Sequence, residues 1–259
     1  MTTLSLIGIG TGNPDHLTLQ AIREINAADL VLIPRKGEGK ADLAELRRAI
    51  LREVLTNPST RVVEFDLPVR DETVPDYRAR VDGWHDAIAG VWQAAMGSPR
   101  PARVALLVWG DPSLYDSTLR IASRLRPLPE VKVIPGITSL QALTAAHAIP
   151  LNTIGGPVTI TTGRQLRDHG WPECAETVAV MLDAGGAFTA AEVAREQQQV
   201  VVGRVEVGDV PVVPAAMQVP DHGHLARLVH AHPADVASAL AVVSLKVVQA
   251  DLRRTAQGV

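Results

Sequence analysis

The chain has 259 residues, of which 46% are hydrophobic and 20% are charged. This composition is typical of a folded globular protein and excludes a disordered or collagen-like chain. The formal net charge is −3, so an anionic ligand must be met by local positive charge rather than by a basic surface. The single cysteine, Cys174, excludes an internal disulfide and a metal site built from several cysteines.

Neither a leader nor a membrane span is expected. The first residues run directly into a short apolar segment without a preceding basic stretch, which argues against a secretory signal. The longest stretch without Asp, Glu, Lys or Arg, residues 133–163, contains three prolines and four glycines and is unlike a membrane helix. We therefore expect a soluble, cytoplasmic α/β protein that binds neither membranes nor nucleic acid.

Strand and helix patterns alternate through the first half of the chain. Short apolar runs predict strands at 4–9, 29–33, 61–65, 104–108 and 131–134. Apolar residues spaced three and four apart predict helices at 17–28, 41–55, 77–96 and 138–147. Pro34 is expected to end the second strand. Alternation of this kind favours parallel strands with helices on both faces of the sheet.

A change of pattern follows. Turn-forming residues cluster at 149–157, which favours a boundary near residue 150 between an N-terminal α/β domain (1–149) and a C-terminal α/β domain (150–259). In the second domain we expect strands at 158–161 and 177–182. A hairpin is expected at 200–213 around Gly208-Asp209, and 237–248 is expected to form a final strand or a helix.

Three loops follow predicted strands, at the edge where open α/β sheets bind ligands. Residues 8–18 read Gly-Ile-Gly-Thr-Gly-Asn-Pro-Asp-His-Leu-Thr, and glycines there let a ligand approach the backbone. Residues 109–118 read Trp-Gly-Asp-Pro-Ser-Leu-Tyr-Asp-Ser-Thr, and residues 134–139 read Ile-Pro-Gly-Ile-Thr-Ser. Taken singly, each loop could be a plain turn whose Asp, Ser or Thr caps the next helix.

A nucleotide-binding interpretation of the first loop also stays open. Its spacing is G-x-G-x-G rather than the dinucleotide pattern G-x-G-x-x-G, and four residues separate the last glycine from the predicted helix. Arg35, just after the second strand, could meet the 2′-phosphate of NADP. The alternative is therefore an NADP-binding reductase.

Together, in this order and spacing, the three loops resemble those of the tetrapyrrole methyltransferases, which transfer a methyl group from S-adenosylmethionine. The resemblance covers roughly residues 4–190 and includes the segments 155–164 and 180–183. It is nearest to members of the cobalamin pathway that methylate carbon 1 of precorrin-5 and release an acetyl group as acetate. It implies a fold of two α/β domains with a ligand cleft between them, and a homodimer.

The resemblance implies the residues that bind the methyl donor S-adenosylmethionine. Hydrogen bonds to its adenine and ribose would come mainly from backbone amides of the loops. The matching positions are Gly10, Thr11, Trp109, Gly110, Asp111, Leu114, Thr138, Ser139 and Leu182.

The acceptor carries many carboxylates, which basic side chains beside the loops could bind. These side chains are Arg35, Lys36, Lys40 and Arg164. No catalytic residue is assigned, because the position of an acid found in some relatives is Pro34 here. Candidates near the loops are Asp111, His16 and Asp183. Methyl transfer by displacement requires no metal.

The end of the chain departs from the resemblance. No aromatic residue follows Phe188, where the family is expected to have an aromatic-rich segment. Histidines stand instead at positions 222, 224, 230 and 232, with Asp221 and Asp235 nearby. These residues could bind a metal, but no periodic pattern supports one, so no metal site is predicted. The sequence therefore does not assign the part of the ligand site that the C-terminal half of the chain would form.

Other functions stay open beside methylation of precorrin-5. Within the family, the acceptor could be another tetrapyrrole position, ribosomal RNA or a protein histidine, although the acidic balance of charge disfavours RNA. A protein that binds the donor without turnover is a further alternative.

Overall fold

The computed structural model describes residues 1–35, 42–146, 148–172, 175, 177–183, 198–203, 215–217 and 245–250. The chain divides into two compact units, the first containing Met1–Thr138 and the second beginning at Ser139. Helix α5 (Ser139–Ala146) is thus counted with the second unit, whereas the boundary expected near residue 150 places it in the first. Its contacts with a strand of the second unit, β10 (Leu245–Ala250), explain this assignment.

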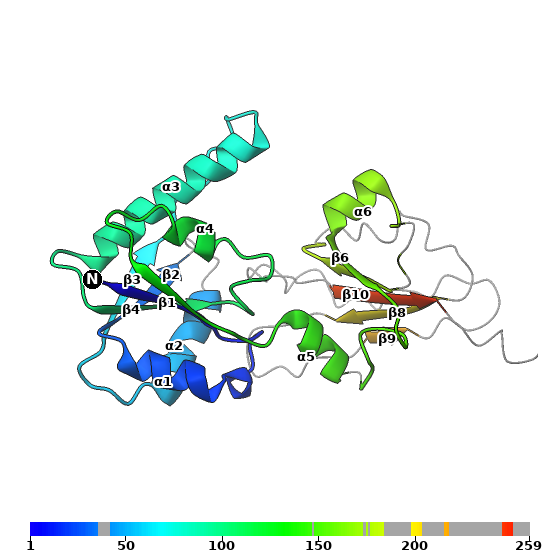
Figure 1. The fold of residues 1–259 in the computed structure, drawn as a ribbon, viewed down its shortest axis with the longest axis horizontal. Helices are drawn as coiled ribbons and strands as arrows, with labels where there is room; N and C mark the ends of the chain where they lie inside the picture. The colour runs from blue at the N-terminus through cyan, green and yellow to red at the C-terminus, as the bar shows by residue number, and fades with distance from the viewer. Residues whose placement is uncertain are drawn as a thin grey trace, which may run out of the picture. The chain divides into compact units, whose positions relative to one another are not determined.

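The first unit is a parallel sheet covered by helices (Figure 1). Its strands lie in the order β3-β2-β4-β1-β5 and are β1 (Thr3–Gly8), β2 (Leu30–Arg35), β3 (Arg61–Asp66), β4 (Arg103–Val108) and β5 (Glu130–Ile134). Its helices are the 3-10 turn η1 (Pro14–His16), α1 (Leu19–Ala27), α2 (Asp42–Val54), α3 (Tyr77–Met96) and α4 (Thr118–Ala122). In Figure 1, α1 and α2 lie on one side of the sheet, and α3 and α4 lie on the other.

Local sequence explains why these helices begin and end where they do. The side chain of Asp76 accepts a hydrogen bond from the N–H of Ala79 at 2.7 Å and so caps α3. The helix ends at Gly97, whose φ of 76° suits glycine. Between these ends, α3 buries Ile88 and Trp92 against the sheet, in the main core of the first unit. Spacing of apolar residues therefore determines which face of the helix is buried.

Pro34 does not end β2, contrary to the sequence-based expectation. The strand continues to Arg35, and Pro34 pairs with Phe65 of β3. Pairing of β2 with β4 stops earlier, at Leu32 opposite Leu106. Since proline has no N–H, a strand tolerates it where only one side needs hydrogen bonds. Beyond Leu32, β2 is therefore bonded to β3 alone.

The second unit contains a mixed sheet. In addition to β10, its strands are β6 (Val158–Thr162), β7 (Thr177–Met181), β8 (Gln198–Gly203) and β9 (Ala215–Met217), in the order β6-β7-β10-β8-β9. Among the described strands of this second sheet, only β6 and β7 pair in parallel, and α6 (Gly163–His169) follows β6. β8 pairs antiparallel with both β10 and β9, and β9 begins after the end of the hairpin predicted at 200–213. Gly208 and Asp209 lie outside the described residues.

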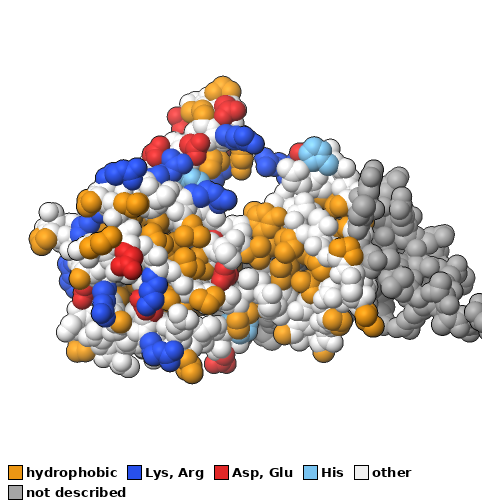
Figure 2. Space-filling view, viewed as in Figure 1, with side chains coloured by type: hydrophobic (Ala, Val, Ile, Leu, Met, Phe, Trp, Pro, Cys, Tyr) orange, Lys and Arg blue, Asp and Glu red, His pale blue; other side chains and the backbone are white. Residues whose placement is uncertain are grey.

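The surface of the first unit has no continuous basic face in the view of Figure 2. Basic and acidic side chains are interspersed there. Several arginines are held in ion pairs with neighbouring acids, as Arg124 is with Asp82 and Asp86. Among the residues that the structure describes, no helix is long and apolar enough to cross a bilayer.

Candidate active site

The three glycine-containing loops belong to neighbouring strands of the first unit. They follow the carboxyl ends of β1, β4 and β5. The N–H of Gly110 donates to the carbonyl of Gly10 at 2.8 Å, and the N–H of Gly10 donates back to Gly110 at 3.3 Å. The structure thus brings the first and second loops together.

The third loop joins the other two through main-chain atoms. A Cβ added to Gly136 would lie 2.2 Å from the carbonyl oxygen of Gly110, and one added to Gly8 would lie 2.6 Å from the nitrogen of Gly136. Any side chain at either position would force the backbones apart. Glycine is therefore required at Gly8 and Gly136 because three chain segments are in direct contact there.

The carboxylate of Asp111 fastens the second loop to the third. One oxygen accepts the N–H of Gly136 at 2.8 Å, and the other accepts the N–H of Ser113 at 2.8 Å and the Ser113 hydroxyl. Burial by itself would raise the pKa of Asp111, but the hydrogen bonds from Ser113 and Gly136 outweigh it and hold the pKa below its usual value. A carboxylate so occupied is a poor proton acceptor. Its geometry favours a role in holding the loops over the catalytic role considered from sequence.

The other two catalytic candidates lie beside loops in different units. His16 belongs to η1, within the first loop, and packs against its glycine Gly10, because a Cβ on Gly10 would lie 2.6 Å from the Cβ of His16. Its Nδ1 is buried and has no hydrogen-bond partner in the described part of the chain. Asp183 is buried in the second unit, where its Oδ1 would lie 2.4 Å from a Cβ on Gly163. It therefore fits tightly against the start of α6.

Predicted donor-binding residues occur in both units. Those of the first are Gly10, Thr11, Trp109, Gly110, Asp111, Leu114 and Thr138, and those of the second are Ser139 and Leu182. The indole N–H of Trp109 is buried and has no acceptor among the described residues. Leu182 follows β7 with a φ of 53° and is 55% exposed. Backbone strain of this kind occurs often at functional sites.

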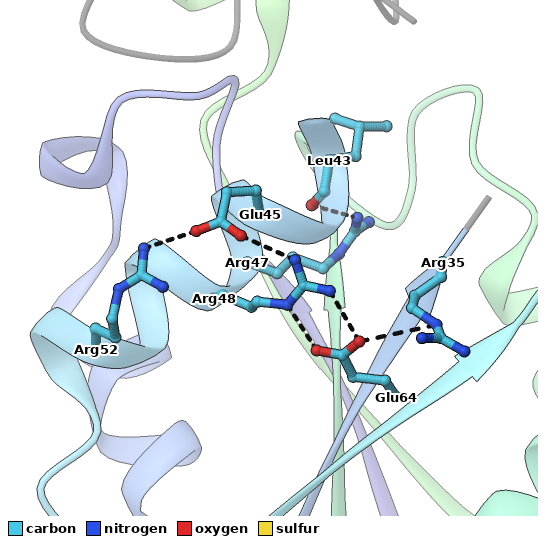
Figure 3. A network of polar contacts seen from close by, with 7 residues as sticks. All are labelled: Arg35, Leu43, Glu45, Arg47, Arg48, Arg52 and Glu64. Carbon is cyan, nitrogen blue, oxygen red and sulfur yellow. Dashed lines mark hydrogen bonds and ion pairs between the residues drawn. The ribbon is translucent and has the colours of Figure 1, made fainter. Parts of the chain in front are cut away.

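Arg35, predicted to bind the acceptor, is already paired within the protein (Figure 3). Its guanidinium lies 2.9 Å from a carboxylate oxygen of Asp66 and 3.8 Å from one of Glu64. Exposed pairs of this kind contribute little, about 0–1 kcal/mol, so a ligand carboxylate could replace one of them. Arg164 is the second residue of α6, and Lys36 and Lys40 lie outside the described residues.

No metal site is found in the described ranges, which contain no group of three acidic, histidine or cysteine side chains suited to an ion. The histidines at 222, 224, 230 and 232 lie outside these ranges.

Sequence reasoning missed Arg47. Its Nε donates to the carbonyl of Leu107 at the end of β4, and its Nη1 donates to the carbonyl of Leu43, both at 2.9 Å. The side chain is buried, with 7% of its surface exposed. A signal was present, because Arg47 comes four residues after Leu43 and three before Ile50 on the apolar side of α2.

Comparisons with known proteins agree with the geometry. A family model described as Tetrapyrrole (Corrin/Porphyrin) Methylases matches residues 3–211. A precorrin-6A synthase (deacetylating) from Sinorhizobium sp. is 49% identical over 198 residues, which cover 74% of this chain and 76% of that protein.

Solved structures show the same fold. A putative cobalamin synthesis related protein (CobF) from Corynebacterium diphtheriae aligns with a TM-score of 0.65 and 38% identity, over 81% of this chain and 83% of that one. A uroporphyrin-III C-methyltransferase from Thermus thermophilus, complexed with S-adenyl homocysteine, aligns with a TM-score of 0.55 over 95% and 91% of the two chains. At 20% identity, this second likeness concerns the fold alone.

Proposed function

The chain belongs to the tetrapyrrole (corrin/porphyrin) methylase family, and from this premise we propose that it methylates carbon 1 of precorrin-5 and releases acetate to give precorrin-6A. It is an S-adenosylmethionine-dependent methyltransferase of cobalamin biosynthesis. The observation that carries the proposal is the likeness to the Sinorhizobium precorrin-6A synthase across three quarters of both chains. The joined glycine loops in the first unit support it.

The residues present fit S-adenosylmethionine. Gly110 has no atom within 4 Å of its would-be Cβ, so a ligand can approach the main chain there, and the buried indole N–H of Trp109 has no acceptor among the described residues. When bound, S-adenosylmethionine supplies an electrophilic methyl group on a sulfonium. The protein must align donor and acceptor and exclude water, which contributes several kcal/mol to such reactions. The proposed donor-binding residues are Gly10, Thr11, Trp109, Gly110, Asp111, Leu114, Thr138, Ser139 and Leu182.

For the acceptor we propose that Arg35, Lys36, Lys40 and Arg164 bind carboxylates of the macrocycle. Loss of the acetyl group needs water at a carbonyl carbon, and His16 and Asp183 remain the candidates to assist it, since both oxygens of Asp111 are occupied. We also propose that the protein is cytoplasmic and forms a homodimer. Sedimentation analysis should then give twice the chain mass of 27.6 kDa.

Incubation of the purified protein with S-adenosylmethionine and precorrin-5 tests the reaction. The expected products are precorrin-6A and one equivalent of acetate. Methyl transfer without acetate would reject the deacetylating reaction and leave the methyltransferase class intact. Calorimetric titration should detect S-adenosylhomocysteine binding and none with NADPH, whereas the reverse result would favour the reductase.

A further inference from the structure

We infer that Arg47 is a positioning residue for the loop between β4 and α4, where it replaces a backbone hydrogen bond that Pro34 cannot make. The inference assumes that this loop binds S-adenosylmethionine and therefore rests on the proposed function. Four observations lead to it: the direction of the β4 carbonyls, the proline in β2, the contacts of Arg47 and the charge of Asp116.

The hydrogen bonds of β4 show which neighbour each of its carbonyls faces. The N–H of Ile9 donates to the carbonyl of Val108, so this carbonyl faces β1. The carbonyl of Arg103 accepts the N–H of Asp29, just before β2, and therefore faces the other neighbour. Because backbone groups alternate in direction along a strand, the odd-numbered carbonyls of β4 face β2.

At the end of β4, the residue of β2 that should donate the next hydrogen bond is Pro34. Pairing between β2 and β4 ends at Leu32 opposite Leu106. The next carbonyl that faces β2 is that of Leu107, and in the same register its donor would be the N–H of residue 34. Proline has none, so the ladder stops and the Leu107 carbonyl needs another donor.

The guanidinium of Arg47 provides that donor. Its Nε lies 2.9 Å from the Leu107 carbonyl oxygen, and its Nη1 is held by the carbonyl of Leu43 one helical turn earlier, as Figure 3 shows for the second bond. A buried carbonyl is costly when it has no donor, which explains why a long cationic side chain occupies the apolar face of α2. The contact fixes the backbone two residues before Trp109.

Charge links Arg47 to the other end of the same loop. Burial lowers the pKa of Arg47 to about 10, and the carboxylate of Asp116 opposes this shift. The side chain is therefore still cationic at neutral pH. Asp116 also accepts the N–H of Thr118 at 2.6 Å, where α4 begins. Arg47 thus bonds to the strand that enters the loop and attracts the residue at which the loop ends.

Affinity for S-adenosylhomocysteine, measured by calorimetric titration, tests this assignment. Arg47→Met should bind about tenfold more weakly than the wild-type protein, in line with the loss of a hydrogen bond from a charged group. Adding Pro34→Ala restores an N–H at residue 34, so the double variant should recover to within about threefold of wild type. Pro34→Ala alone should be near wild type. Arg48→Met, the next residue of α2, is the control, since Arg48 pairs with Glu64 and Glu45.

The outcomes separate this inference from the proposed function. If the wild-type protein does not bind S-adenosylhomocysteine, the proposed function fails. If wild type binds and Arg47→Met binds equally well, or if Pro34→Ala gives no recovery, the role of Arg47 is rejected. Should Arg47→Met not fold, Arg47→Lys carries the test, because an ammonium retains the charge and a donor. An affinity of Arg47→Lys within about threefold of wild type would support the inference, and a tenfold loss of affinity in this variant would overturn it.

Discussion

Asp111 connects two loops through the two oxygens of one carboxylate, which accept the N–H groups of Ser113 and Gly136. An asparagine keeps one acceptor but presents an NH2 group to the other donor. We expect Asp111→Asn to lower the free energy of unfolding by about 1–3 kcal/mol and to weaken S-adenosylhomocysteine binding. Urea unfolding and calorimetric titration measure the two effects. A folded variant with unchanged affinity would contradict the assignment of this loop to the donor site.

Glycine contacts lead to a second prediction at the residue scale. Gly136→Ala places a Cβ against the backbone of Gly110 and should abolish the native loop arrangement, with a strongly lowered melting temperature. Gly90, inside α3, has no atom within 4 Å of its would-be Cβ. Gly90→Ala should therefore stabilise the protein by about 1 kcal/mol through helix propensity. Equal melting temperatures for the two variants would contradict this account of the loops.

Among single residues, sequence predicted those that belong to local motifs. The motifs placed Gly8, Gly110 and Gly136 in three loops that follow strands, but not the contacts between these loops. The double contact of Asp111 and the donor role of Arg47 were missed, since each depends on partners brought near by the sheet rather than by the chain.

At the scale of elements, α3 contains a buried titratable group. Both ring nitrogens of His85 lack a hydrogen-bond partner in the described part of the chain. Burial, followed by the positive charge of Arg124, lowers the pKa of His85, so the folded protein keeps it neutral. An unfolded histidine binds a proton near pH 6.5. The contribution of His85 to the free energy of unfolding is therefore complete above that pH and is lost as the pH drops toward the lowered pKa of the folded protein.

Replacing His85 should remove its contribution to the pH dependence of stability. We expect His85→Leu to raise the free energy of unfolding at pH 7 by about 1 kcal/mol, because two buried nitrogens without partners are lost. Between pH 7 and about 5 the variant should lose less stability than the wild-type protein. Urea unfolding at both pH values measures this difference, and an equal fall in the two proteins would rule out His85 as its source.

The elements of the first unit were largely predictable. Each strand and helix predicted there lies within two residues of its observed bounds, because its periodicity is local. The role of Pro34 was mispredicted, since a missing N–H matters only on the side where a neighbouring strand needs it. The second strand of the hairpin predicted at 200–213 was also misplaced: β8 pairs with β9 and β10, which lie beyond that segment, and pairing across a long connection leaves little local signal.

At the scale of the whole molecule, the first unit contains its own core. The main hydrophobic cluster is drawn from residues between Leu4 and Leu125, and all five strands of the parallel sheet belong to this unit. The division into two α/β parts was predicted. The assignment of α5 was not, because it reflects contacts with β10, about 100 residues later.

Truncation after Thr138 tests this independence. The shortened chain should unfold cooperatively in urea, as a single domain with its own core does. It should not bind S-adenosylhomocysteine in a calorimetric titration, because Ser139 and Leu182 of the proposed donor site are missing. Binding as tight as that of the full chain would exclude these two residues from the site.

The contact of three loops through their main chains has a consequence for hydrogen exchange. The amide hydrogens of Gly10, Gly110 and Gly136 are each bonded to a neighbouring loop. The two bonds between Gly10 and Gly110 join backbones directly, whereas Gly136 is held by the side chain of Asp111. The amides of Gly10 and Gly110 should therefore exchange with solvent deuterium through one shared opening, with equal protection free energies. A bound ligand would then slow both together, which makes this pair of glycine signals a reporter of occupancy in the intact protein.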